Sequence, residues 1–254
     1  MSTITLLIKA NNSRQLEFIG KNLESTFKGL KVNTEVHKIA SNKWVQVTVS
    51  GEDEAVAQHY LADEIGLCPV AIDNVKTLSV VKGFATSLNK NKDALSVDIG
   101  VFSPNTIYAS IPLSQLQAQL VDGRKMALKK IVELFGICEN LPLETRILKV
   151  DKEEKCIGAS LSEKQVAQYR EWVDSLLDRL IVLGASFNGV KLAVEMADLN
   201  RDVVNIEPLG MFEHVVTCKL GTDAAGLIPK IGKNLRNASF IIFNPRKIKE
   251  ILEQ

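Results

Sequence analysis

The pattern of apolar residues changes near Leu78, and this change limits the folds open to the chain more than any other sequence feature. Before it the runs are long, with apolar residues at helical spacing between Arg14 and Phe27 and alternating runs on either side. After it come five short strand-like runs with turn residues between them, at 79–86, 94–99, 107–112, 143–150 and 156–161. Beyond residue 161, long helical and strand-like runs return.

These patterns predict an α+β protein of three modules. The runs of residues 1–78 follow the order β-α-β-β-α-β, typical of a small ferredoxin-like module, with an extended run at 70–81 as its last strand. The short runs of residues 79–161, with a helical insertion between the third and fourth, predict a Greek-key barrel of the OB type. Residues 162–254 predict a second β-α-β-β-α-β-type module that a long helix opens.

Local signals place the elements of the last module. Ser162 and Gln165 form a capping box at the start of the long helix. Trp172 neighbours the apolar stripe of this helix, so we expect it to be a core or interdomain anchor. Strands are expected at 180–184, 203–206, 212–218 and 239–243, and helices at 190–197 and 224–235.

The charges cancel over the whole chain but not along it. There are 31 Lys and Arg residues against 30 Asp and Glu residues, and this net charge of +1 excludes a protein that holds nucleic acid by bulk charge alone. Residues 161–218 carry 5 basic and 9 acidic residues, whereas residues 219–249 carry seven basic residues and one acid, Asp223. A basic strip is therefore hidden in a neutral total.

The basic strip predicts a surface that contacts phosphate groups. On the helix expected at 224–235, Lys230 and Lys233 share a face, and Arg236 lies one further i+3 step along. The simpler interpretation is a solvated helix face with cations near its C-terminal end, where the helix dipole favours them. The sequence leaves both interpretations open.

No residue pattern predicts a metal, a cofactor or catalysis. His214 and Cys218 share a strand face, but at ~3.3 Å per residue they are about 13 Å apart, too far to hold one zinc ion. The run GTDAAG at 221–226 lacks the Lys-Ser/Thr ending of a P-loop, so a capped helix entry is favoured over a phosphate cradle. We expect a non-catalytic protein. An enzyme acting at the Thr222–Asp223 loop is kept as the hypothesis of lowest rank, below the two binding functions given at the end of this section.

The chain carries no signal for a membrane or an oxidising compartment. No run approaches the ~18 consecutive apolar residues of a membrane span, and the first apolar run is too short for a signal-peptide core. Cys68, Cys138, Cys156 and Cys218 are scattered without CxxC spacing, which favours free thiols. We expect a cytoplasmic protein.

The central segment resembles the S1 RNA-binding domain. The runs VVKGF at 80–84, VDIG at 97–100 and ASIPLSQL at 109–116 are similar to the first three S1 strands, and 143–161 is similar to the closing hairpin. S1 domains usually carry base-stacking aromatic residues in the second and third strands, where this chain reads DALS at 93–96 and ASIP at 109–112. Phe84, Phe102 and Tyr108 are the remaining candidates for stacking.

Over its full length the chain resembles the archaeal family called domain of unknown function 2110. The resemblance lies in the S1-like centre, the run CKLGTDAAGLIP at 218–229, and the shorter runs DRL at 178–180 and RDVV at 201–204. It implies an archaeal cytoplasmic protein related to RNA, and it implies no particular activity.

From the residues and the resemblance together we predict a non-catalytic RNA-binding, ribonucleoprotein-associated or translation-associated factor. The alternative is a protein–protein adaptor whose degenerate S1 barrel no longer binds RNA, which the missing aromatic residues favour. The expected RNA contacts are Lys82, Phe84, Lys90, Lys92, Phe102, Tyr108 and Arg124 on the barrel, and Lys219, Lys230, Lys233, Arg236, Arg246 and Lys247 in the basic strip.

Overall fold

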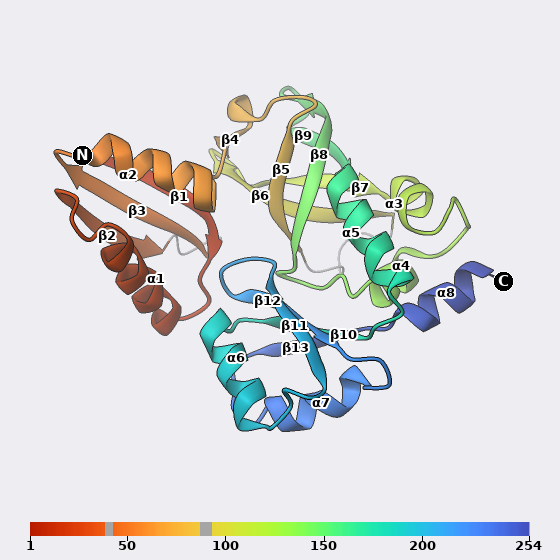
Figure 1. The fold of residues 1–254 in the computed structure, drawn as a ribbon. Coiled ribbons are helices and arrows are strands. Elements are labelled where there is room, and N and C mark those ends of the chain that lie inside the picture. The colour runs from red at the N-terminus through yellow and green to blue at the C-terminus, as the bar shows by residue number, and fades with distance from the viewer. Residues whose placement is uncertain (39–42, 87–92, 254) are drawn as a thin grey trace. The chain divides into compact units, whose positions relative to one another are not determined.

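The structure is a computed structural model that describes residues 1–38, 43–86 and 93–253 (Figure 1). The chain forms two compact units, one of Met1–Val75 with Ile99–Ile107 and the other of Lys76–Asp98 with Tyr108–Gln254. The described residues form helices and three sheets, so the predicted α+β class is confirmed.

The first unit is built on a three-stranded antiparallel sheet of order β1-β3-β2. Asn12 caps the first helix, because its side chain accepts a hydrogen bond from the backbone N–H of Gln15 at 3.0 Å. Ile19, Leu23 and Phe27 are buried, as the helical spacing predicts. The elements are β1 (Ser2–Lys9), α1 (Ser13–Thr26), β2 (Val32–Lys38), β3 (Trp44–Gly51), α2 (Glu54–Tyr60) and the π-helix η1 (Leu61–Ile65).

The single strand expected at 70–81 does not form. Pro69 has no backbone N–H to donate, and Val70 has a φ of +66°, so the backbone turns where the strand would begin. What forms instead is a two-residue strand, β4 (Val70–Ala71), which pairs in parallel with a barrel strand before the 3-10 turn η2 (Ile72–Asn74). In place of a paired last strand, the described residues show one isolated antiparallel bridge to β1, between Leu6 and Leu67.

The five short runs form a closed five-stranded barrel, as predicted. The strands pair in the order β6-β5-β8-β9-β7, and a further pairing of β6 with β7 closes the barrel. The pairs β5–β8 and β8–β9 are antiparallel, whereas β7 and β9 run in parallel. The strands are β5 (Val80–Ala85), β6 (Ala94–Ser103), β7 (Ile107–Pro112), β8 (Pro142–Asp151) and β9 (Cys156–Leu161).

The insertion between β7 and β8 carries α3 (Leu113–Leu120) and α4 (Leu128–Leu134). The helically spaced apolar residues in and just after α4 are buried: Leu128, Ile131, Val132 and Phe135. Gly136 follows with a φ of +63°. A Cβ on Gly136 would lie 3.1 Å from Cδ1 of Ile181. The chain therefore leaves α4 through a left-handed turn that packs closely against the last sheet, and glycine suits this position.

The last part of the chain follows the predicted β-α-β-β-α-β order after a helix. Its sheet is antiparallel, with strand order β11-β12-β10-β13. The elements are α5 (Glu163–Asp174), β10 (Arg179–Leu183), α6 (Phe187–Met196), β11 (Val203–Pro208), β12 (Glu213–Cys218), α7 (Ala224–Ile231), β13 (Ser239–Phe243) and α8 (Pro245–Glu253).

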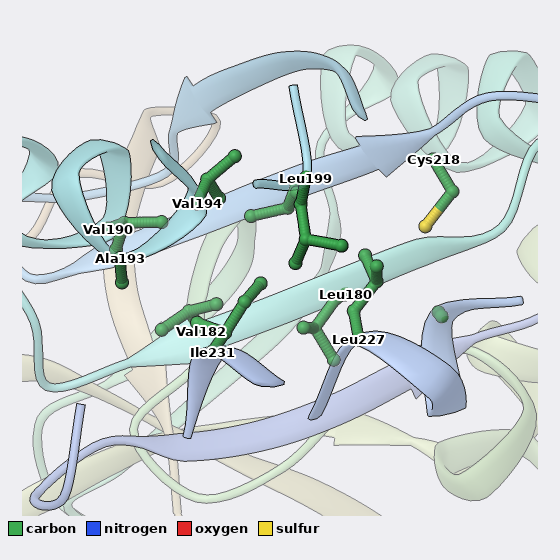
Figure 2. Packing of buried hydrophobic residues seen from close by; sticks show 11 residues of the cluster. Leu180, Val182, Val190, Ala193, Val194, Leu199, Cys218, Leu227 and Ile231 are labelled. Carbon is green, nitrogen blue, oxygen red and sulfur yellow. The ribbon is translucent and has the colours of Figure 1, made fainter. Parts of the chain in front are cut away.

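Helices α6 and α7 pack on one face of this sheet (Figure 2). Alternate residues of β10, Leu180 and Val182, point into the same cluster as Val190 of α6 and Leu227 of α7. Each of these side chains is at most 2 % exposed. Burial of a side chain of this size contributes roughly 1.5–3 kcal/mol, so this cluster is a main source of the stability of the sheet.

The opposite face of the sheet packs against α5 and the end of α4. The ring of Phe243 contacts Phe135, Tyr169 and Trp172, with centroid distances of 6.4, 6.2 and 5.3 Å. Trp172 is 5 % exposed. Trp172 therefore belongs to the core between α5 and the last sheet, as predicted, and Phe135, which follows α4, joins the barrel insertion to the same cluster.

Three features of the last part of the chain differ from the sequence prediction. Ser162 accepts from the N–H of Gln165 at 3.1 Å, but the Gln165 amide oxygen accepts from the N–H of Glu144, so half of the capping box forms. Helix α7 ends at Ile231 instead of 235, because Gly232 follows with its poor helix propensity. Helix α8 was not predicted.

Candidate nucleic-acid interface

Helices α7 and α8 begin beside the same two recesses. Asp223 caps α7, since its Oδ1 accepts from the N–H of Ala225 at 2.9 Å. Asn244 caps α8, since its Oδ1 accepts from the N–H of Lys247 at 3.0 Å. Asp223 and Asn244 line both recesses, which therefore adjoin, and together we call them the α7–α8 groove.

The larger recess has a volume of about 750 Å³ and lies among α4, α7, β13 and α8. Three lysines line it, Lys129 and Lys130 from α4 and Lys247 from α8, together with one further acid, Glu133. Its remaining surface is apolar, from Ala127, Leu134, Ala225, Ile242 and Ile251. The larger recess thus combines an apolar surface with ammonium groups.

The smaller recess, of about 270 Å³, follows the loop between β12 and α7. It brings the side chains of Lys219 and Arg246 to one place, together with Asp178. Asp178 Oδ2 accepts from the N–H of Ala224 at 3.4 Å. Burial raises the pKa of the Asp178 carboxyl, and the charge of Arg246 opposes this shift.

The acids of the groove have local partners, whereas most of the cations do not. Glu133 lies 3.9 Å from the ammonium group of Lys129, one helical turn away, and Asp223 is a helix cap. Within the described part of the chain, no ion pair is found for four cations of the groove, which are exposed: Lys130, Lys219, Arg246 and Lys247. These cations are free to meet an external anion.

The structure brings together half of the predicted basic strip. All six of its predicted contact residues are exposed, and three of them line the groove: Lys219, Arg246 and Lys247. The prediction that Lys230, Lys233 and Arg236 share a helix face is wrong, because α7 ends at Ile231 and only Lys230 lies on it. Lys233 and Arg236 lie in the turn that leads to β13.

The barrel candidates do not gather in this way. Lys82 is exposed beside a separate recess of about 170 Å³, which Glu144 and Lys164 also line. Tyr108 is 44 % exposed, whereas Phe84 is 5 % exposed and lies in the core, so its ring offers no surface to a base. Phe102 is half-buried in the β6 segment of the first unit.

Arg124 is engaged within the protein. Its Nη1 donates to the backbone oxygen of Ile251 at 3.0 Å, and its Nη2 donates to that of Leu252. These oxygens belong to the last turn of α8, whose carbonyl groups have no partners within the helix. Lys90 and Lys92, the other two barrel candidates, lie outside the described residues.

The groove residues missed from the sequence include Lys129, Lys130 and Asn244. The pair Asn244-Pro245 was a detectable signal, because Asn is a strong N-cap and Pro is favoured at the first helical position. Lys129 and Lys130 carried no such signal, since only tertiary packing places α4 beside α8.

The described residues hold no cluster of three or more His, Cys, Asp or Glu side chains that could bind a metal ion. His214 and Cys218 are both buried in β12, and the Nε2 of His214 lies 3.0 Å from the backbone oxygen of Ala185. In the same described ranges, no helix is long and apolar enough to span a membrane.

Comparison with protein families matches three consecutive stretches of the chain. Residues 3–69 match the DUF2110 N-terminal domain, residues 75–173 the DUF2110 central domain, and residues 177–243 the DUF2110 C-terminal domain. The chain belongs to the DUF2110 family. The expected resemblance to this family is confirmed, and the groove residues of the β12–α7 loop, α7 and β13 lie in the C-terminal domain of this family.

None of the curated proteins matches the chain in sequence. Among solved structures, a chain of the a/eIF2alpha–aDim2p–rRNA complex from Pyrococcus horikoshii OT3 is similar, with 12% identity and a TM-score of 0.27 over 49% of this chain. The match covers 64% of that chain, less than two thirds of its length. The intact alpha subunit of aIF2 from Pyrococcus abyssi has 9% identity and a TM-score of 0.25, over 67% of this chain and 97% of that chain.

Proposed function

We propose that this protein is a non-catalytic RNA-binding factor, associated with ribonucleoproteins or translation, that contacts RNA through the α7–α8 groove and the basic strip around it. In this proposal residues 79–161 are an S1-like OB module. It lies in sequence between a ferredoxin-like module at 1–78 and a second β-α-β-β-α-β module at 162–254.

The observation that carries the proposal is the convergence of the four exposed groove cations, Lys130, Lys219, Arg246 and Lys247. A structural role would give them carboxylate partners, and the described residues supply none within ion-pair distance. Phosphate groups of a nucleic acid suit such a site, because their binding to cations releases condensed counterions. The simpler interpretation, cations that favour a helix C-terminus, does not apply to Lys219, Arg246 and Lys247, which lie before or near helix starts.

The barrel adds less to this interface. Lys82 and Tyr108 are exposed and are kept as secondary contacts, since an exposed ring is able to stack on a base. We leave Phe84 and Arg124 out of the proposed surface, because one is buried and the other holds the end of α8.

A titration of a short single-stranded RNA against salt concentration tests the proposal. Four phosphate contacts give a slope of log K against log salt of about −2.8, at ~0.7 for each contact on a single strand. The variant Lys219→Gln/Lys247→Gln removes two phosphate contacts and is expected to make the slope less negative by about 1.4.

The matched control is Lys21→Gln/Lys28→Gln, which removes the same charge from exposed residues in and just after α1. We expect this variant to bind as the unmodified protein does. No RNA binding at low salt, or an equal loss of affinity in both double variants, contradicts the proposal.

The burial of Phe84 favours a second candidate function, a protein–protein adaptor whose barrel no longer binds RNA. The ratio of absorbance at 260 and 280 nm of the untagged protein distinguishes the two, because co-purified RNA raises it. A ratio typical of pure protein, together with no binding in the titration, favours the adaptor.

A further inference from the structure

The larger recess of the α7–α8 groove has a composition that phosphate binding alone does not explain. Five apolar residues line it between the cations, including Leu134, Ile242 and Ile251. Ile242 and Ile251 are half-buried, and Ala127 and Ala225 are exposed, so this apolar surface is open to a ligand. A site for phosphate groups alone needs donors and positive charge, and it gains nothing from an apolar surface.

The volume of the recess sets the size of its occupant. At about 750 Å³ it lies in the range typical of sites for small organic ligands, and it is too large for a phosphate group alone. An unpaired nucleotide offers the matching chemistry, an apolar base face joined to an anionic backbone. In an A-form duplex the bases are stacked inside, and the outer surface offers mainly phosphate and ribose groups.

The cations lie where the backbone of such a nucleotide would run. Lys130 from α4 and Lys247 from α8 line the recess that holds the apolar surface, and Arg246 and Lys219 line the adjoining smaller recess. A strand that places its base in the larger recess therefore has cations available in both recesses for successive phosphate groups.

We propose that the larger recess binds unpaired nucleotides of a single RNA strand, with bases against Ile242 and Ile251 and phosphates against Lys130 and Lys247. This inference rests on the proposed function, and it adds that the RNA is single-stranded and that its bases bind in the larger recess. The residues that line the recess include no aromatic ring among those described, so base contact is apolar packing and distinguishes poorly between sequences.

Fluorescence anisotropy with the full-length protein tests the inference at one fixed salt concentration. The probes are a labelled 12-nucleotide oligouridylate and a 12-base-pair RNA duplex. We expect the single strand to bind at least tenfold more tightly than the duplex. Equal affinities, or tighter binding of the duplex, overturn the inference while the proposed function stands, whereas no binding of either probe overturns both.

Two variants that fill the recess locate the contact. Ala225→Leu and Ala127→Leu both start from exposed residues, so neither disturbs the core, and neither adds a ring on which a base could stack. Each is expected to weaken single-strand binding at least fivefold without changing duplex binding. The control is Ala167→Leu, an exposed residue of α5 outside the groove. Unchanged single-strand binding in both groove variants overturns the subsite.

Uridine monophosphate as a competitor separates a strand from a free nucleotide. If the occupant is a strand, the mononucleotide competes only at millimolar concentration, because it lacks the neighbouring phosphates that contact Lys219 and Arg246. Competition at micromolar concentration identifies a free nucleotide as the ligand and overturns the assignment to an RNA strand.

Discussion

The guanidinium group of Arg179 lies over the ring of Trp172, with its Cζ 5.3 Å from the ring centroid. Its Nη1 also donates to the backbone oxygen of Trp172 at 3.1 Å, to Ser175 Oγ at 2.9 Å and to the backbone oxygen of Leu177 at 2.9 Å. Arg179 is 6 % exposed and starts β10, whereas Trp172 lies in the last turn of α5. One arginine thus ties the end of α5 to the start of the last sheet.

This relationship predicts that Arg179→Met destabilises the protein by about 2–4 kcal/mol, because buried oxygens lose a donor and the ring loses its cation. Urea unfolding measures the loss. The control is Arg170→Met, an exposed arginine of α5 whose replacement is expected to change stability by no more than ~0.5 kcal/mol. Equal effects of the two substitutions would contradict the structural role of Arg179.

The buried carboxyl of Glu213 predicts a pH dependence of stability. Burial raises the pKa of Glu213 to about 7 from an ordinary value of 4.5, while the backbone N–H of Phe212 opposes the shift. The folded state therefore holds the proton more tightly than the unfolded state. Stability falls as the pH rises from about 4.5 to about 7, by roughly 3 kcal/mol in total, and this contribution is constant above that range.

The variant Glu213→Gln isolates this effect, because the amide has a similar shape and no charge. The difference in unfolding free energy between the variant and the unmodified protein is expected to grow in favour of the variant from pH 4.5 to pH 7. A difference that is independent of pH would show that Glu213 titrates normally.

The two ends of α8 depend on Asn244 and Arg124. Asn244→Ala removes the N-cap and is expected to cost about 1 kcal/mol, and Arg124→Gln releases the last carbonyl groups. Both variants are expected to speed amide hydrogen exchange in residues 245–253 more than elsewhere. Lys125→Gln, at an exposed neighbour, serves as the control and should leave exchange in α8 unchanged.

Gly51 and Gly29 form a matched pair for backbone strain. Both have positive φ values, +130° and +101°, but a Cβ on Gly51 would lie 2.1 Å from the backbone oxygen of Lys31, whereas a Cβ on Gly29 meets no atom within 4 Å. Gly29→Ala is expected to cost about 1 kcal/mol through strain alone. Gly51→Ala is expected to cost several times more, and equal losses of stability in urea would contradict the described turn.

Much of the fold follows from local patterns. The five barrel strands lie within a few residues of their predicted positions, because turn residues and alternation act over neighbours in sequence. The strand expected at 70–81 does not form, because Pro69 lacks a backbone N–H and Val70 has a positive φ, which turns the backbone at that point. Helix α8 was missed although Asn244 and Pro245 carry a recognisable start signal.

The candidate site was predictable in part. The count of charges along the sequence located the basic strip, and Lys219, Arg246 and Lys247 do line the groove. The count of charges did not distinguish these three residues from Lys233 and Arg236. To do so, one must know where α7 ends and where the following turn lies.

By itself, the sequence determined the order of most elements, the resemblance to the family and the presence of a basic strip, since each of these is recorded in runs of neighbouring residues. Only the tertiary structure decided which cations share a recess and which barrel candidates stay available. Lys130 and Lys247 lie far apart in sequence, and they line one recess because α4, α7 and α8 pack around the same edge of the last sheet. Packing likewise buried Phe84 and joined Arg124 to the end of α8, which no local pattern records.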